Sequence, residues 1–243
     1  MSSALSFHLS DDQIALRDMV RNFVQKEILP VAAKYDQTGE FPHDVIGKAW
    51  ELGIMNVAVP STFGGLGFGC VEDVILNEEL GAGCLGMATS ITVNTLGLYP
   101  ILLGGTEAQI RELVGPILEA PKLVSFCLTE PNAGSDAAGL STTVRDDGDH
   151  FVLNGSKMWI TNAGHASLYS VFATVEKNLR SKGSVCLAVP RDLPGISLGK
   201  HEDKMGQRCS DTRAITFDNV RVPKKYLIGK VGDGMKIAFA TLD

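Results

Sequence analysis

The chain has 243 residues, of which 44% are hydrophobic and 21% charged, proportions typical of an ordinary soluble protein. Its 22 Lys and Arg against 28 Asp and Glu give a net charge of -6, which argues against nucleic-acid binding because that function needs a basic face. The sequence has no basic cluster suited to an anionic membrane. Its five cysteines lack the C-x-x-C pairs of a metal site and favour buried, reduced thiols.

The first half of the chain has the patterns of α-helices. Ser10 and Gln13 form a capping box, and the apolar residues that follow recur at helical spacing until Pro30, which we expect to bend or end the helix. Further helices are expected over residues 44–52 and 71–80. Thr106-x-x-Gln109 is a second capping box, and it predicts a helix that runs to about residue 118.

Two segments of this half resemble signals for other functions. Leu85–Leu103 is the most apolar stretch, but its hydroxyl side chains and Pro100 favour a buried core helix over a membrane span. Gly64–Gly69 is rich in glycine, yet both of its neighbours are predicted helices. A dinucleotide fingerprint requires a strand before it, so we expect an inter-helix loop.

Beyond Pro121 the hydrophobic period changes to that of β-strands. Asp146–Gly148 and Asn154-Gly155 have the composition of tight turns between neighbouring strands. The expected fold is a multidomain α+β protein, with a helical domain over 1–120, an antiparallel β-barrel or sandwich over 121–230, and the start of a truncated helical domain over 231–243. The seven predicted strands cover residues 123–128, 140–145, 150–154, 157–160, 168–175, 185–189 and 214–217.

A polar loop and a strand end carry the candidate chemistry. In the loop Leu128–Asp136, Thr129 is suited to bind the polar edge of a ring, and the backbone N–H groups of Ala133, Gly134 and Ser135 are suited to a phosphate. The alternative is a plain turn with a satisfied serine. Trp159 is either a core tryptophan or an aromatic side chain that packs beside a flavin, with Thr161 donating to the flavin's redox-active edge.

Several motifs together resemble the acyl-CoA dehydrogenase family, its medium-chain members most of all. The resemblance extends over nearly the whole chain. Its motifs are Phe126–Asp136, Lys157–Asn162, Met205–Arg213 and Phe217–Pro223, with shorter matches at Tyr35–Gly39 and Ala49–Gly53.

The resemblance implies FAD as cofactor and a fatty acyl-CoA as substrate. In that family a glutamate removes the α-proton of the thioester, a hydride passes to the flavin, and electrons continue to an electron-transfer flavoprotein. Full-length relatives are homotetramers of the mitochondrial matrix, although this N-terminus has no visible presequence. Ser135 and Asp243 would contact substrate, and the implied cofactor-binding residues are Phe126, Cys127, Leu128, Thr129, Gly134, Ser135, Trp159, Ile160 and Thr161.

The sequence departs from the family at the catalytic base. The family's glutamate lies beyond Asp243, so no residue of this chain is assigned that role, and Glu130 is expected to be structural. We therefore expect an incomplete form of the enzyme. The alternatives are a non-catalytic acyl-CoA- or partner-binding module and, ranked last, an acyl-CoA oxidase. Residues 89–98 are expected to line the acyl pocket, where Thr92-Val93 differs from the medium-chain pattern.

Overall fold

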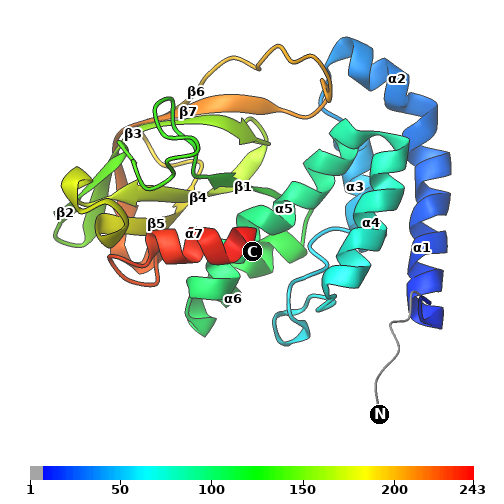
Figure 1. Cartoon of the computed structure of the whole chain (residues 1–243), viewed down its shortest axis with the longest axis horizontal. Helices are drawn as coiled ribbons and strands as arrows, with labels where there is room; N and C mark the ends of the chain where they lie inside the picture. The colour runs from blue at the N-terminus through cyan, green and yellow to red at the C-terminus, as the bar shows by residue number, and fades with distance from the viewer. Residues whose placement is uncertain (1–7) are drawn as a thin grey trace.

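The computed structural model describes residues 8–243 and shows a helical half beside a sheet half (Figure 1). The helical half consists of six α-helices, α1 to α6. The prediction of an all-helical N-terminal region is confirmed. The helices are α1 Asp11–Phe23, α2 Leu29–Thr38, α3 His43–Glu51, α4 Cys70–Gly83, α5 Leu85–Gly104 and α6 Glu107–Leu118.

Local sequence signals fix where most of these helices begin and end. Both predicted capping boxes form, at Ser10 on α1 and at Thr106 on α6. The break expected at Pro30 lies earlier, because a π-helical turn over Val24–Ile28 joins α1 to α2 and Pro30 lies in the first turn of α2. The π-turn interrupts the regular i→i−4 hydrogen-bond pattern just before Pro30, which is where a residue without an N–H group can be accommodated.

The sheet half is built from eight strands in the order β6-β7-β3-β2-β4-β5-β8, and β1 pairs with β4 from outside this path. Most pairs are antiparallel as predicted, but β1 runs parallel to β4. Two short strands, β6 and β8, were not predicted. The strands are β1 Leu123–Cys127, β2 Thr143–Asp147, β3 His150–Thr161, β4 Ala166–Thr174, β5 Ser184–Pro190, β6 Ile196–Leu198, β7 Thr212–Pro223 and β8 Leu227–Ile228.

One turn prediction was wrong. Asn154-Gly155 does not separate two strands but lies inside β3, where the register with β7 shifts. Gly155 has φ +144°, and a Cβ placed on it would lie 2.6 Å from the Cα of Thr142. The glycine is therefore required by a bulge and a close approach of two backbones, which is the other common use of glycine in a strand. The turn predicted over Asp146–Gly148 forms between β2 and β3, with Asp146 and Asp147 still in β2 and φ +69° at Gly148.

Helix α5 joins the two halves. The Asn94 side chain accepts a hydrogen bond from Val124 N–H at 2.5 Å, and Ser170 donates to the Gly97 carbonyl at 2.7 Å, so the helix is bonded to β1 and β4. In length and hydropathy α5 would suffice to cross a membrane. Its burial against both halves matches the predicted core helix.

The last helix, α7 (Gly234–Leu242), packs on β5 and α5 (Figure 1). Met235 N–H donates to Ser184 Oγ at 2.8 Å at its first turn. A Cβ on Gly234 would lie 2.6 Å from Val185 N, so only glycine permits this close contact. The predicted order of a helical region, a mostly antiparallel sheet and a final helix is thus confirmed.

Candidate functional site

The two signature segments predicted from the sequence lie side by side. The loop that follows β1 runs along β3, and Met158 N–H donates to the Thr129 carbonyl at 2.9 Å. This bond holds Thr129 beside Met158, the residue that precedes Trp159. The loop and the strand therefore form one surface.

Trp159 lies in a bulge of β3. The pairing of β3 with β7 shifts between Lys157 and Ile160, and Trp159 has φ +60°, a left-handed conformation that costs roughly 1–2 kcal/mol for a residue with a Cβ. Its side chain is 54% exposed, so the alternative of a core tryptophan is wrong. A strained backbone that presents a large aromatic ring to solvent is typical of a ligand site.

The loop offers backbone donors for an anion. Gly134 and Ser135 are exposed, and within residues 8–243 their N–H groups have no protein acceptor. A Cβ placed on Gly134 would meet no atom within 4 Å. Ala133 differs from the expectation, because its N–H is bonded to the Glu130 carbonyl at 3.2 Å.

The remaining predicted residues divide by burial. Phe126 and Thr161 are half-buried, and Thr161 accepts a hydrogen bond from Ser125 Oγ through its carbonyl. Cys127 and Ile160 have buried side chains, so any contact with a ligand on the exposed surface would involve their backbone. Leu128 is also buried, and Asp243 is exposed at the end of α7.

A buried ion pair supports this surface from below. Lys157 Nζ lies 2.7 Å from Glu130 Oε1 and 3.1 Å from the Leu128 carbonyl, and both charged side chains are almost fully buried. Glu130 also accepts hydrogen bonds from the N–H groups of Ser141 and Thr142. The pair therefore ties both ends of the loop to β3.

The surroundings of Glu130 favour its ionised form. Burial alone would raise the pKa of Glu130, but the Lys157 ammonium and the donors from Ser141 and Thr142 lower it overall. Burial lowers the pKa of Lys157, and Glu130 opposes that change. Glu130 is thus held as a carboxylate by the Lys157 ammonium and two backbone N–H groups.

The arrangement fits a flat ring with an attached phosphate. The exposed indole of Trp159 offers a packing surface. The half-buried Thr161 follows it in β3, and the half-buried Thr129 is bonded to the preceding residue, Met158. The N–H groups of Gly134 and Ser135 fit phosphate oxygens, since adjacent unpaired backbone donors bind anions.

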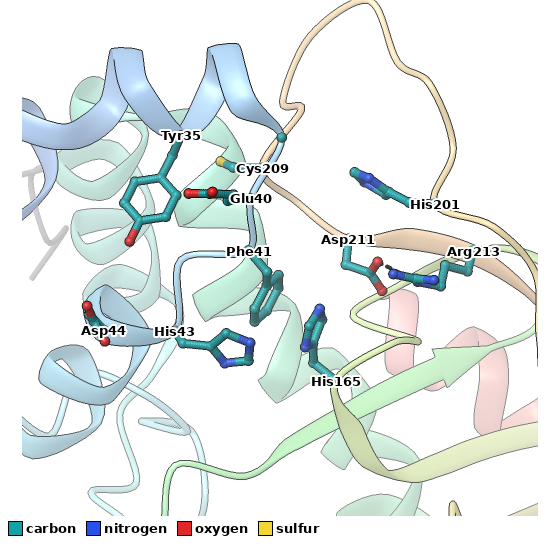
Figure 2. Close-up of a pocket in the computed structure, with 11 residues that line it drawn as sticks. Tyr35, Glu40, Phe41, His43, Asp44, His165, His201, Cys209, Asp211 and Arg213 are labelled. Carbon is teal, nitrogen blue, oxygen red and sulfur yellow. Dashed lines mark hydrogen bonds and ion pairs between the residues drawn. The ribbon is translucent and has the colours of Figure 1, made fainter.

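Apart from this surface, a cavity of about 510 Å³ lies between the two halves (Figure 2). Phe41 stacks on His165 with 3.8 Å between ring centroids, and His43 meets His165 edge to face. Burial lowers the pKa of His165. No sequence pattern predicts this cluster, because its residues are far apart in the chain and belong to no motif.

Comparison with known proteins identifies the family. Residues 10–120 match the acyl-CoA dehydrogenase N-terminal domain, and residues 125–220 match the middle domain. A probable medium-chain specific acyl-CoA dehydrogenase of Caenorhabditis briggsae is 39% identical over 242 residues, covering 98% of this chain and 59% of that protein. The short-chain specific enzyme of Bos taurus is 42% identical over 239 residues, covering 98% and 58%.

Solved structures of the same family have the same fold. Butyryl-CoA dehydrogenase from Megasphaera elsdenii superposes with a TM-score of 0.93 at 34% identity, covering 98% of this chain and 63% of that one. An acyl-CoA dehydrogenase from Bacillus anthracis complexed with FAD gives 0.88 at 33% identity, covering 96% and 41%. This chain thus spans less than two thirds of the length of these relatives. By sequence and by fold, the chain belongs to the acyl-CoA dehydrogenase family.

Proposed function

We propose that the chain supplies the flavin-ring side of an FAD-dependent enzyme that introduces an α,β double bond into fatty acyl-CoA thioesters. The observation that carries the proposal is the exposed, strained Trp159, held beside the loop by the Met158–Thr129 bond. The solved complex of a relative with FAD supports the cofactor.

Each residue of the surface has a role in this proposal. Trp159 packs beside the ring, Thr129 and Thr161 donate hydrogen bonds to its polar edge, and Gly134 and Ser135 bind a phosphate through their N–H groups. The bound flavin supplies an acceptor for two electrons and a hydrogen from the substrate. The chain's own contribution is to bind and orient the ring and the thioester.

We propose that no residue of this chain serves as the catalytic base. Glu130, the carboxylate at the loop, is buried and paired with Lys157. General-base catalysis contributes roughly 10²–10⁴ in rate. The chain alone is therefore expected to bind cofactor without measurable turnover.

The acyl chain is proposed to enter a cavity of about 300 Å³ between α4 and α5. Thr92, Val93 and Leu96 line it from α5, and Tyr99 lies at the same helix face. The β-branched Val93 narrows this space, which favours short or medium acyl groups. Val93→Gly is expected to raise the affinity for octanoyl-CoA relative to butyryl-CoA in calorimetry, and an unchanged ratio would contradict this assignment.

The cellular location, the electron acceptor and the assembly of the whole protein are also proposed from the relatives. The two curated relatives above are named as mitochondrial enzymes, which supports a mitochondrial location. An electron-transfer flavoprotein is the proposed electron acceptor, and a homotetramer the proposed assembly of the whole protein. The proposed domain boundary near residue 120 is supported by the extents of the two matched domains, and a boundary at residue 230 is also proposed.

Substrate-dependent bleaching of bound flavin tests the proposal. The purified chain is mixed anaerobically with FAD and then with butyryl-CoA or octanoyl-CoA, and a flavin spectrum is recorded at each step. We expect a shifted spectrum from bound flavin and no bleaching. Bleaching by this chain would contradict the assignment of no base. A protein that binds acyl-CoA tightly but leaves the flavin spectrum unchanged would support the alternative, a non-catalytic acyl-CoA-binding module.

A further inference from the structure

Two cysteines from the two halves of the molecule lie next to each other. Cys84 joins α4 to α5, and Cys209 lies in the loop between β6 and β7. The Cys84 and Cys209 side chains interact with each other. A Cβ placed on Gly86 would lie 2.8 Å from Cys209 Sγ, so this sulfur packs directly on the first turn of α5.

Contacts on both sides of Cys209 hold its loop against the helices. Thr89 Oγ1 donates to Gln207 Oε1 at 2.9 Å, and the Arg208 guanidinium lies 3.0 Å from the Asp36 carboxylate. Gln207 also has φ +51°, an uncommon conformation that these contacts must maintain. The two sulfurs are therefore kept together by the folded structure.

The two thiols have different environments. The hydrogen bond from Cys209 and the N–H groups of Met87 and Gly86, at the N-terminus of α5, lower the pKa of Cys84 to about 6. The pKa of the buried Cys209 is raised, by its bond to Cys84 and by burial. A cysteine whose ionised form is favoured, next to one whose protonated form is favoured, resembles a nucleophilic cysteine and its resolving partner.

Small molecules can reach the pair. Cys84 is half-buried, and Cys209 is part of the lining of the 510 Å³ cavity between the two halves. Figure 2 shows its sulfur at the edge of that cavity, near Tyr35 and Glu40. A peroxide is small enough to enter a space of this size.

We propose that Cys84 and Cys209 form a reversible disulfide on exposure to a peroxide, and that this bond locks the helical half to the sheet half. The Cys84 thiolate attacks one peroxide oxygen, the O–O bond breaks, and the leaving hydroxide takes up a proton to become water. Cys84 is thereby oxidised by two electrons to a sulfenic acid. Cys209 sulfur then attacks Cys84 sulfur, the S–O bond breaks, and a second water leaves with the Cys209 proton.

The other three cysteines lack this combination of properties. Burial raises the pKa of Cys127 and of Cys186, so both remain protonated thiols. Cys70 is exposed at the start of α4. Cys70 is therefore a matched control for non-specific oxidation.

Peptide mapping of the whole chain tests the proposal without a variant. The reduced protein is treated with equimolar hydrogen peroxide, its remaining thiols are alkylated, and it is digested for mass spectrometry. We expect the Cys84–Cys209 linked peptide as the main product, its loss after dithiothreitol treatment, and a higher midpoint of thermal unfolding in the oxidised form. Cys70→Ser is expected to leave this yield unchanged.

A trapping experiment identifies which cysteine attacks first. In Cys209→Ser, the sulfenic acid has no resolving thiol, so dimedone is expected to label Cys84 several-fold more than in the wild-type chain. The proposal is overturned if wild-type protein gives dimedone-labelled Cys84 with no linked peptide. It is also overturned if the only disulfide found joins two chains through Cys70.

Discussion

Trp159 combines two properties that a purely structural residue would not have. Its backbone is in the left-handed region, and its indole is exposed instead of packed in the core. Both features lower stability in the absence of a ligand. They are accounted for if the bulge exists to present the indole to a ring.

This strain predicts an unusual order of stability among variants. At an ordinary strand position glycine is about 0.5–1 kcal/mol less favourable than alanine. At position 159 we expect Trp159→Gly to be more stable than Trp159→Ala by about 1 kcal/mol, because only glycine adopts φ +60° without cost. Urea unfolding of the two variants measures the difference, and an alanine variant as stable as the glycine variant would show that the bulge stores no strain.

Removing one charge of the Lys157–Glu130 pair is expected to lower the stability of the folded protein. Lys157→Met leaves the buried Glu130 carboxylate without its counter-charge and is expected to cost about 3–5 kcal/mol of unfolding free energy. The double variant Lys157→Met/Glu130→Leu removes both charges and should recover most of this loss. If the double variant is as unstable as the single one, packing and not charge explains the effect.

The same ion pair makes the stability of the folded protein depend on pH in the acid range. The pKa of Glu130 is lowered in the folded state, so the stability it contributes is fully present above its ordinary value of 4.5 and is lost as pH falls through the lower folded value. We expect the unfolding free energy of the wild type to fall more steeply below about pH 4.5 than that of the double variant. Parallel profiles would contradict this linkage.

Among individual residues, the sequence predicted those that belong to continuous motifs. The segments that contain Thr129 and Trp159 meet through the Met158–Thr129 bond, and Gly134 and Ser135 are exposed in the same loop as Thr129. By contrast, the Cys84–Cys209 contact joins residues 125 positions apart, and no local pattern predicts which helix turn faces which loop.

At the scale of elements, α5 depends on small residues at its contact with β1. A Cβ on Gly97 would lie 2.7 Å from the Val124 carbonyl oxygen, which is backbone and cannot move aside cheaply. Gly97→Ala is therefore expected to destabilise the protein by about 1–3 kcal/mol. Thermal and urea unfolding measure this change.

Gly115 in α6 is the matched control. A Cβ at that position would meet no atom within 4 Å, so Gly115→Ala should stabilise the helix by up to about 1 kcal/mol. Equal effects of the two substitutions would contradict the role given to the close contact between Gly97 and Val124.

The elements that the sequence predicted are those with strong local signals. The capping boxes at Ser10 and Thr106 define the starts of α1 and α6. The strands β6 and β8 have three and two residues, too few for a hydrophobic period to be recognised. The pair Asn154-Gly155 is common both in tight turns and in bulges, so the sequence alone does not distinguish them. The close approach of the Thr142 backbone to Gly155 shows that the structure here is a bulge.

At the scale of the whole molecule, the helical and sheet halves act as one support for the candidate site. Helix α5 is bonded to β1 and β4, and the loop before β7 is bonded to α2 through Arg208 and Asp36. The proposed flavin surface belongs to the sheet half. A cofactor bound there should therefore protect two short segments of the sheet half and leave α1 to α4 unchanged.

Hydrogen exchange with and without excess FAD tests this claim most directly. The N–H groups of Gly134 and Ser135 lack protein acceptors within the described part of the chain, so they should exchange quickly in the free protein. We predict that FAD slows exchange in peptides covering residues 128–136 and 158–162, and that Trp159→Ala weakens this protection. Unchanged exchange in both segments at saturating FAD, or protection confined to other parts of the chain, would contradict the assignment of the flavin site.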